Sequence, residues 1–169
     1  MSAVITGSQN GTVGLINAGT AVASTSGTSI DFTGIPAGVK RITVMFNGVS
    51  TNGTSTVQIQ LGDSSGVKTT GYTSAGSYNG PGNGGSNSTT GLIVIHGPNA
   101  VSLCSGICTL ALISGSTWVS SSVLGRNAET YTQMGGGVVA LSGTLDRVRI
   151  TTVNGTDTFD AGSINILYE

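Results

Sequence analysis

Two cysteines and one histidine carry the most reactive side chains of this sequence. Cys104 and Cys108 stand four positions apart in the stretch LCSGIC, and His96 closes the apolar run LIVIH. A structural zinc ion needs four ligands, so these three residues would have to recruit a carboxylate or a second subunit. A redox pair is normally Cys-x-x-Cys at the start of a helix, whereas this spacing is one residue longer and no helix is predicted here. Zinc stays open only with such help, and a redox pair is disfavoured.

A disulfide between the two cysteines conflicts with an extended chain. In a strand their Cα atoms would lie about 13 Å apart, whereas a disulfide spans at most about 7 Å. Only a tight turn at Ser105 and Gly106 would bring the sulfurs together. In a continuous strand Cys104 and Cys108 share one face with Leu110, and free cysteine is readily buried. We expect two buried thiols.

Catalysis would need His96 or a pair of carboxylates. A triad of His96 with a serine is possible, but no Gly-x-Ser-x-Gly elbow leads into a helix, so a structural histidine at a strand end is favoured. Asp157 and Asp160 could touch Ca²⁺, yet they lack a loop with six or more oxygen ligands, and an exposed turn is favoured. We expect no enzymatic activity and no cofactor. The carboxylates that a glycoside hydrolase could use show no signature spacing; they are Asp31, Asp63, Glu129, Asp146, Asp157 and Asp160.

The charged residues are concentrated in two segments. The chain has six basic and seven acidic residues, and eight of them lie in SIDFTGIPAGVKRITV and GTLDRVRITTVNGTDTFDAG. On neighbouring strands, Lys40 and Arg41 would face Asp157 and Asp160, and Asp31 would face Arg147 or Arg149. These charges then set the register within one sheet, which is the favoured interpretation, or they line a subunit interface. The candidate interface residues are Lys40, Arg41, Arg147, Arg149, Asp157 and Asp160.

The elements that would position these residues are strands. With 169 residues, the chain suffices for one hydrophobic core. Residues 1–27 lack any sustained period and read as an extended N-terminal arm. Residues 28–169 are predicted to form a single all-β domain, an antiparallel β-sandwich of about 8–10 strands with a jelly roll as the leading topology. Core-facing residues alternate in two clear strands, which present Ile42, Val44 and Phe46, and Val57, Ile59 and Leu61; Gln58 and Gln60 should face water.

Two polar segments are predicted to be loops. Residues 66–90 contain Gly, Asn and Pro in place of an apolar pattern, and they carry Tyr72 and Tyr78. The stretch NAETYTQMGGG forms the second loop, with Glu129 and Tyr131. Aromatic faces on such loops suit stacking against sugars, so Tyr72, Tyr78 and Tyr131 are candidate receptor residues. The alternative, that the tyrosines anchor their loops, is the commoner situation.

Net charge and hydropathy exclude two partner classes. A formal charge of −1 provides too few cations to displace the counterions of a nucleic acid. No apolar stretch approaches the roughly 20 residues that span a bilayer, and the first residues lack the basic and apolar regions of a cleaved signal. We expect neither nucleic acid nor a membrane as a partner.

Two blocks of the sequence resemble a known family. TSGTSIDFTGIPAGVKRITVMFNGVSTNGTSTVQIQLGDSSGV together with SGTLDRVRITTVNGTDTFDAGSINILYE is similar to a β-rich domain of tailed-bacteriophage virion proteins, often at the C-terminus of tail fibre or related tail proteins. The resemblance implies a non-enzymatic structural or adhesive module, commonly trimeric in fibres. It also implies a virion location, with assembly in the bacterial cytoplasm, where reducing conditions favour thiols.

Three functions follow from the resemblance and the residues together. The leading hypothesis is a capsid or tail decoration or fibre-type protein that residues 1–27 attach to other virion proteins and that associates with itself. The second is a receptor-binding adhesin that recognises a host surface glycan through Tyr72, Tyr78 and Tyr131. The third and least favoured is a depolymerase, which would require carboxylates such as Asp146 or Asp157.

Overall fold

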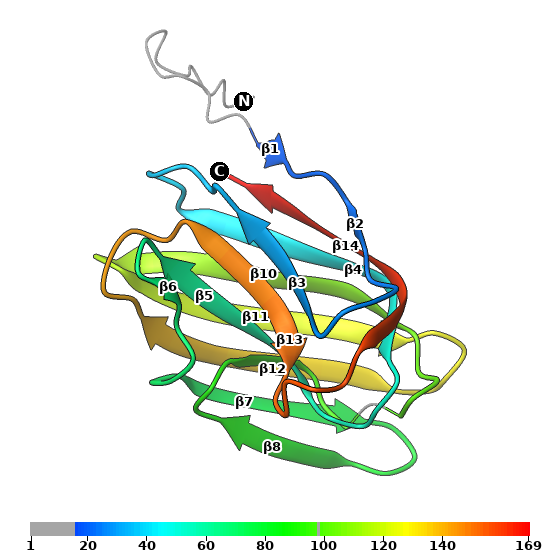
Figure 1. The fold of residues 1–169 in the computed structure, drawn as a ribbon. Coiled ribbons are helices and arrows are strands. Elements are labelled where there is room, and N and C mark those ends of the chain that lie inside the picture. The colour runs from blue at the N-terminus through cyan, green and yellow to red at the C-terminus, as the bar shows by residue number, and fades with distance from the viewer. Residues whose placement is uncertain (1–15, 98) are drawn as a thin grey trace, which may run out of the picture.

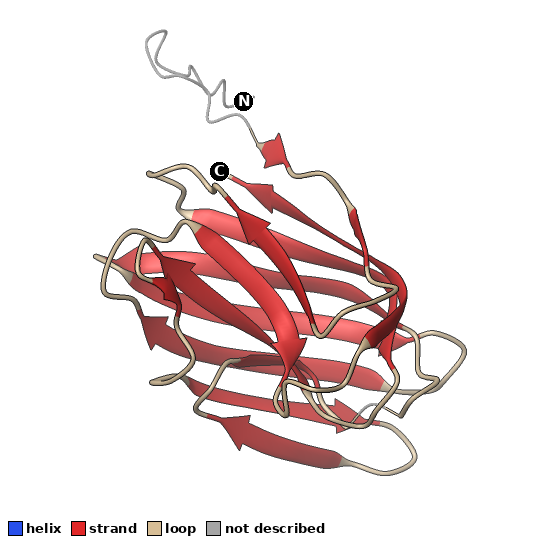
Figure 2. Cartoon of the chain, viewed as in Figure 1, coloured by secondary structure: helices blue, strands red, loops and turns tan. Residues whose placement is uncertain are grey.

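The fold consists of two antiparallel β-sheets packed face to face (Figures 1 and 2). It is known from a computed structural model that describes residues 16–97 and 99–169. The larger sheet comprises β1 (Asn17–Ala18), β2 (Val22–Ala23), β4 (Arg41–Thr51), β7 (Thr73–Asn79), β8 (Gly84–Ser88), β10 (Cys104–Ser114), β11 (Thr117–Arg126), β12 (Thr132–Ala140) and β14 (Phe159–Tyr168). The smaller sheet comprises β3 (Ser29–Thr33), β5 (Val57–Asp63), β6 (Gly66–Val67), β9 (Leu92–Ile95) and β13 (Arg147–Thr152). The predicted all-β sandwich is confirmed.

The order of the strands shows how the sequence is distributed over the two sheets. The nine-stranded sheet runs β1-β14-β4-β10-β11-β12-β7-β8, with β2 also on β14. The five-stranded sheet runs β3-β13-β5-β6, with β9 on the free part of β5. The chain crosses repeatedly between sheets, so strands that are neighbours in space are often distant in sequence. No helix among the described residues is long and apolar enough to cross a bilayer.

Alternating apolar residues from both sheets fill the space between them. The predicted inward residues of β4 and β5 are all buried, as are Val148 and Ile150 of β13. Ile164 and Ile166 of β14 complete the same core. Burying an aliphatic side chain of this size contributes about 1.5–3 kcal/mol, so this alternating pattern is the main source of stability.

Residues 66–90 form strands where a long surface loop was predicted. β7 and β8 make a hairpin in which Tyr78 pairs with Gly84, and β7 also pairs with β12. Their inward positions are small because β9 packs directly on them: a Cβ added at Gly76 would lie 2.3 Å from Cγ2 of Ile93. The MGGG stretch belongs to β12 for the same reason. These strands bring the total within residues 16–97 and 99–169 to fourteen, above the predicted range.

The two glutamines of β5 are buried, although they were predicted to face water. Gln58 and Gln60 do lie on the outer face of the smaller sheet, but the segment between β8 and β9 covers them. Ser88 and Thr90 donate hydrogen bonds to Oε1 of Gln58, each at 3.1 Å, and Nε2 of Gln60 donates to the carbonyl of Thr90 at 2.9 Å. The predicted alternation of inward and outward residues along β5 is correct. The sequence did not predict that the segment between β8 and β9 would cover the outward glutamines.

The later part of the predicted arm is attached to the sandwich. β1 and β2 pair with β14 in the antiparallel sense, with Asn17 opposite Tyr168 and Val22 opposite Ile164. Residues 1–15 of the predicted arm lie outside the described part of the chain. β1 and β2 therefore lie at the edge of the nine-stranded sheet, next to the C-terminal strand β14 (Figure 1).

Candidate functional site

The two cysteines lie where their alternation placed them. Both are free and fully buried, and both lie on the inner face of the continuous strand β10. Burial raises the pKa of Cys104 to about 11 and that of Cys108 to about 12. Because the thiolate is the reactive form, both sulfurs are inert at neutral pH. The prediction of two packed thiols is confirmed.

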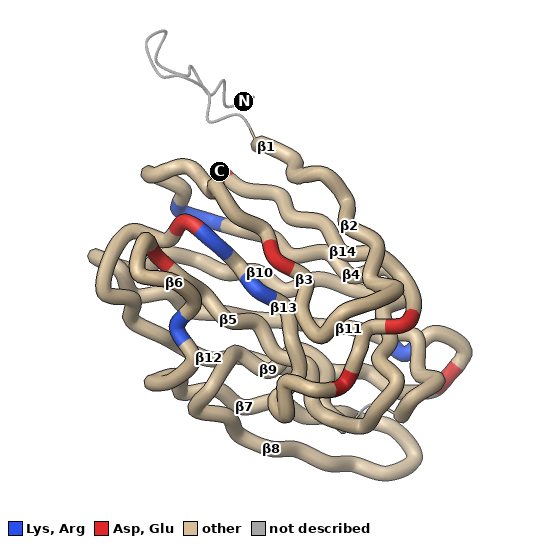
Figure 3. Tube along the Cα trace, viewed as in Figure 1, with Lys and Arg blue, Asp and Glu red and all other residues tan. Residues whose placement is uncertain are grey.

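The predicted pair between Asp31 and an arginine is present. Arg149 and Asp31 are directly opposite on β13 and β3, and the guanidinium donates two hydrogen bonds to the carboxylate, at 2.7 and 3.0 Å. Arg147, the other candidate, instead binds its neighbour Asp146 through Nε at 2.6 Å. These pairs lie on the outer side of the smaller sheet, where Figure 3 shows basic and acidic residues along β13 and β3.

The predicted contact of Lys40 and Arg41 with Asp157 and Asp160 is wrong. β14 runs antiparallel to β4, so Phe159 is opposite Thr51 and Tyr168 is opposite Ile42. The acidic pair therefore lies near the far end of β4, about 30 Å from Lys40 at a rise of about 3.3 Å per residue. Arg41 forms an ion pair with Glu169, the last residue of the chain.

Asp157 and Asp160 stabilise local backbone geometry. Asp157 accepts hydrogen bonds from the amide of Ser55 at 2.9 Å and from Nδ2 of Asn154 at 2.6 Å. Asp160 accepts a hydrogen bond from the hydroxyl of Ser50. Within residues 16–97 and 99–169, no group of three or more His, Cys, Asp or Glu side chains gathers that could hold a metal ion. Of the two carboxylates considered for Ca²⁺, that of Asp157 thus accepts hydrogen bonds within a turn, and that of Asp160 accepts one from Ser50 of β4.

Tyr72 is a core residue, which removes it from the predicted receptor surface. Its side chain is only 2% exposed. Its hydroxyl accepts a hydrogen bond from the amide of Leu61 at 2.8 Å and donates one to the carbonyl of Lys68 at 2.9 Å. Burial raises the pKa of this phenol to about 12. Tyr72 therefore anchors the segment after β6, as the alternative interpretation held.

The other two candidate tyrosines meet at one end of the sandwich. The rings of Tyr78 and Tyr131 pack edge to face with centroids 5.8 Å apart, and His96 stacks on Tyr78 at 5.4 Å. The guanidinium of Arg126 lies 4.8 Å from the Tyr131 centroid and 5.6 Å from that of Tyr78. We call these four residues the tyrosine–arginine cluster. The structure thus brings together two of the three predicted aromatic residues.

Sequence analysis did not single out Arg126, which organises this cluster. It is 7% exposed and donates hydrogen bonds from Nη2 to the carbonyls of His96 and Gly97. Its alternation with Trp118 and Leu124 along β11 was the signal that it points inward. Arg126 lies against both tyrosine rings and His96 stacks on Tyr78, so part of the aromatic surface that a sugar would use is already occupied.

Buried polar atoms without partners also occur in the tyrosine–arginine cluster. Among the described residues, Nδ1 of His96, Nε of Arg126 and Nε2 of the adjacent Gln133 are buried and form no hydrogen bond. Burial, and then the charge of Arg126, lower the pKa of His96. A neutral His96 with an unshared nitrogen has no serine or carboxylate partner here, so the cluster has the geometry of a packed strand end.

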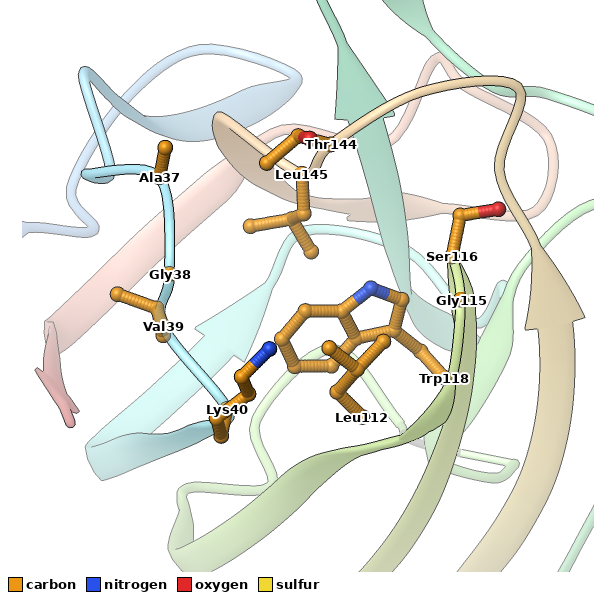
Figure 4. A pocket seen from close by; sticks show the side chains of 10 residues that line it. All are labelled: Ala37, Gly38, Val39, Lys40, Leu112, Gly115, Ser116, Trp118, Thr144 and Leu145. Carbon is orange, nitrogen blue, oxygen red and sulfur yellow. The ribbon is translucent and has the colours of Figure 1, made fainter.

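A small cavity opens at the opposite end of the sandwich, near the start of β4 (Figure 4). Trp118 lies at its base, and Lys40 and Leu145 line its sides. Its volume is about 150 Å³, whereas small-molecule sites usually occupy about 300–1,000 Å³. The indole ring of Trp118 is buried, so it presents no open face for stacking. This cavity holds a few water molecules at most.

The outer face of the nine-stranded sheet carries two apolar rows, separated by a row of Thr, Ser and Gly, with Arg41 at the β4 end of the second row. A row of side chains crosses four adjacent strands in register: Met45, Ile107, Val123 and Met134. Ile107 is 50%, Val123 56% and Met134 46% exposed. A second row consists of Ala111, Val119 and Val138. We call this surface the apolar sheet face.

Charge is absent from most of the strands beneath this face. β7, β8, β10 and β12 contain no charged residue, and β11 contains only Arg126, which points inward. Figure 3 shows these strands uncoloured apart from the end of β11. Sequence analysis missed the surface because its residues alternate with core residues and align only when the strand register is known.

Comparisons with known proteins found no matching family model, no matching curated protein and no matching solved structure.

Proposed function

We propose that this protein is a non-enzymatic structural subunit of a tailed-bacteriophage particle and that it associates with its own copies through the apolar sheet face. The apolar sheet face is the observation that carries the proposal, because exposed apolar side chains from adjacent strands gather there with little charge among them, and such patches often mark interaction sites. The phage particle itself is inferred from the sequence resemblance of residues 25–169. The N-terminal segment, residues 1–27, would attach the subunit to other virion proteins.

The scarcity of charge favours a second copy as the occupant of this face. Across a twofold axis residue i contacts residue j and j contacts i, and residues close to the axis meet their own counterparts. Like charges would then repel, whereas rows of Met, Ile and Val can interdigitate. Depletion of charge at the centre is also what distinguishes protein interfaces from other surface.

The size of the face predicts a weak contact for an isolated pair. The two rows cross four strands, about 19 Å at about 4.8 Å per strand, and span five residues along each strand, about 17 Å. The projected area is therefore about 320 Å² per copy, or about 640 Å² in total, well below the roughly 1,200 Å² of stable pairs. Many copies held together on a particle would compensate for this weakness.

Val123→Lys tests the self-association, because Val123 lies at the centre of the apolar row and is exposed enough to tolerate the change. Val153→Lys is the matched control: it is 47% exposed but lies after β13, on the other sheet. In sedimentation equilibrium, the unmodified protein and the control should associate with rising concentration, and Val123→Lys should weaken association at least tenfold. A protein that stays monomeric at millimolar concentration, or a Val123→Lys variant that associates normally, would refute the interface.

The oligomer size and the attachment segment have separate tests. A patch that pairs with itself gives a dimer, whereas the trimer expected from the resemblance needs a head-to-tail contact, and sedimentation distinguishes the two. Removing residues 1–15 leaves β1 and β2 in place and should abolish incorporation into purified phage particles. Undiminished incorporation would show that attachment lies elsewhere.

A receptor-binding role is the second candidate, but its site has changed. Tyr72 is buried, and the rings of Tyr78 and Tyr131 are partly occupied within the tyrosine–arginine cluster. A different surface, on the smaller sheet, favours this role.

A further inference from the structure

A polar groove crosses the outer face of the five-stranded sheet. Its volume is about 340 Å³, and its floor comes from residues that face outward in register on three strands. Gln58 of β5 is opposite Thr151 of β13, which is opposite Ser29 of β3. In the next outward row, Gln60 is opposite Arg149. We call this the glutamine groove.

The floor of the glutamine groove is held in place before any ligand arrives. Gln58 is 1% and Gln60 7% exposed, although both lie on the outer face of their sheet. Oε1 of Gln58 and Nε2 of Gln60 are engaged by Ser88 and Thr90, as described above. Among the described residues, Nε2 of Gln58 and Oε1 of Gln60 form no hydrogen bond. Gln58 is almost completely covered, so Oε1 of the slightly more exposed Gln60 is the fixed acceptor that a ligand can reach, and its rotamer needs no further ordering on binding.

The groove is electrically balanced. Arg149 is the only charged residue among its lining side chains, and both of its hydrogen bonds to Asp31 run along the sheet surface. The remaining lining groups are hydroxyls, amides and backbone, including the exposed Thr69, and one apolar side chain, Val153. An anion would have to compete with Asp31 for Arg149, whereas neutral hydroxyl groups can both donate to and accept from this set.

We infer that the glutamine groove binds a neutral oligosaccharide. Its volume lies near the lower limit of about 300 Å³ for small-molecule sites, which suits one or two sugar rings. No aromatic residue lines it, so recognition relies on hydrogen bonds, and the affinity of a single site is millimolar. Display of many copies on one particle raises the effective affinity by a factor of about 10²–10⁴. The multivalent display rests on the proposed function, because it requires many copies on one particle. The binding of sugar by a single groove does not depend on the proposed function.

The experiment measures binding of the full-length protein to an array of neutral and acidic oligosaccharides from bacterial O-chains and capsules. Binding is expected to neutral members, and the two sources are distinguished by their positions on the array. The best neutral oligosaccharide is then titrated into the protein and followed by NMR chemical-shift changes. Binding restricted to acidic members, or no neutral binding tighter than about 10 mM, would overturn the inference.

Two variants locate the binding site. Gln60→Leu removes the free acceptor with little change of volume, and Thr69→Val removes an exposed hydroxyl without disturbing the core. Each should weaken binding about 3- to 10-fold, as expected for one lost hydrogen bond. Thr89→Val, an exposed position outside the lining residues, should bind normally. Unchanged affinity in both groove variants would place the sugar elsewhere.

Two further measurements distinguish loss of sugar binding from loss of the fold and from loss of self-association. The urea midpoint of each variant, read from Trp118 fluorescence, shows whether the fold is intact. The Val123→Lys variant should lose self-association and keep its affinity for the soluble oligosaccharide. Failure of the groove inference therefore leaves the proposed self-association untouched, and the reverse also holds.

Discussion

Replacing Gly135 by alanine should open the contact between the two sheets. Gly135 lies on the inner face of β12, where β9 crosses it. A Cβ at this position would lie 2.2 Å from the carbonyl oxygen of Ile93 and 2.9 Å from Oγ of Ser122. The first atom belongs to the backbone of β9, so it cannot move aside as a side-chain tip could. One of the two strands must therefore shift by about 1 Å to restore ordinary contact.

The size of the effect follows from overpacking. Extra volume in a well-packed interior costs about 1–3 kcal/mol, and removing a strand glycine returns about 0.5–1 kcal/mol of backbone entropy. The offset leaves a net range of about 0–2.5 kcal/mol, and because the obstructing atom is backbone we expect the free energy of unfolding to fall by about 1–2 kcal/mol. Gly136→Ala is the matched control, because Gly136 faces outward on the same strand and its nearest new contact is 3.3 Å away. That variant should lie within about 0.5 kcal/mol of the unmodified protein, with either sign.

Urea unfolding at one protein concentration measures both variants. Trp118 is the only tryptophan of the chain and is buried, so its fluorescence reports the loss of packing. With a denaturant slope of about 2 kcal/mol/M, Gly135→Ala should lower the midpoint by about 0.5–1 M and Gly136→Ala should barely move it. Equal midpoints for the two variants would show that β9 does not press on β12, and the account of the glycine-rich strands would fail.

Three further outcomes are expected. Tyr72→Phe should destabilise the fold by about 1–3 kcal/mol in urea melts, because the buried amide of Leu61 loses its acceptor; an unchanged midpoint would contradict the anchoring role. Cys104 and Cys108 should react with Ellman's reagent only as fast as the protein unfolds, with rates that rise with urea, and immediate labelling in buffer would refute their burial. The pKa of His96 is lower in the folded protein than in the unfolded chain, so the unfolded state binds more protons: stability should be complete above about pH 6.5 and decline as the pH falls toward the folded pKa. His96→Phe should remove that decline, and an identical pH profile in this variant would show that other groups cause it.

Alternation of branched apolar residues made part of the fold predictable. β4 and β5 place Ile42, Val44 and Ile59 inward as expected because branched apolar residues recur at every second position there. β7, β8 and the glycine-rich first part of β12 gave no such signal, whereas the VVAL end of β12 was predicted as a strand. The inward positions beneath β9 are mostly serine and glycine, since β9 lies too close for larger side chains, and a strand built from small residues reads as a loop.

The candidate sites depended on register, which one sequence does not reveal. Asp31 and Arg149 were paired correctly, because the two segments do form neighbouring strands. Lys40 and Asp160 were also predicted to pair because their segments form neighbouring strands. β14 runs antiparallel to β4, however, so the two residues lie at opposite ends of the strand pair. The apolar sheet face and the glutamine groove are both products of register, each assembled from strands that are distant in sequence.

The positions of these two surfaces limit how they can act together. The apolar sheet face and the glutamine groove lie on the outer sides of opposite sheets, so a dimer formed through the apolar faces points its two grooves in opposite directions. Such a dimer cannot place both grooves on one flat cell surface, and its avidity for that surface equals that of a monomer. Multivalent attachment then requires many subunits on one particle, each presenting one groove outward. A purified dimer should accordingly bind a glycan-coated surface no more tightly than Val123→Lys does, whereas intact particles should bind it far more tightly than either. A dimer that showed avidity of its own would mean that the subunits meet along strand edges, with both grooves on the same side.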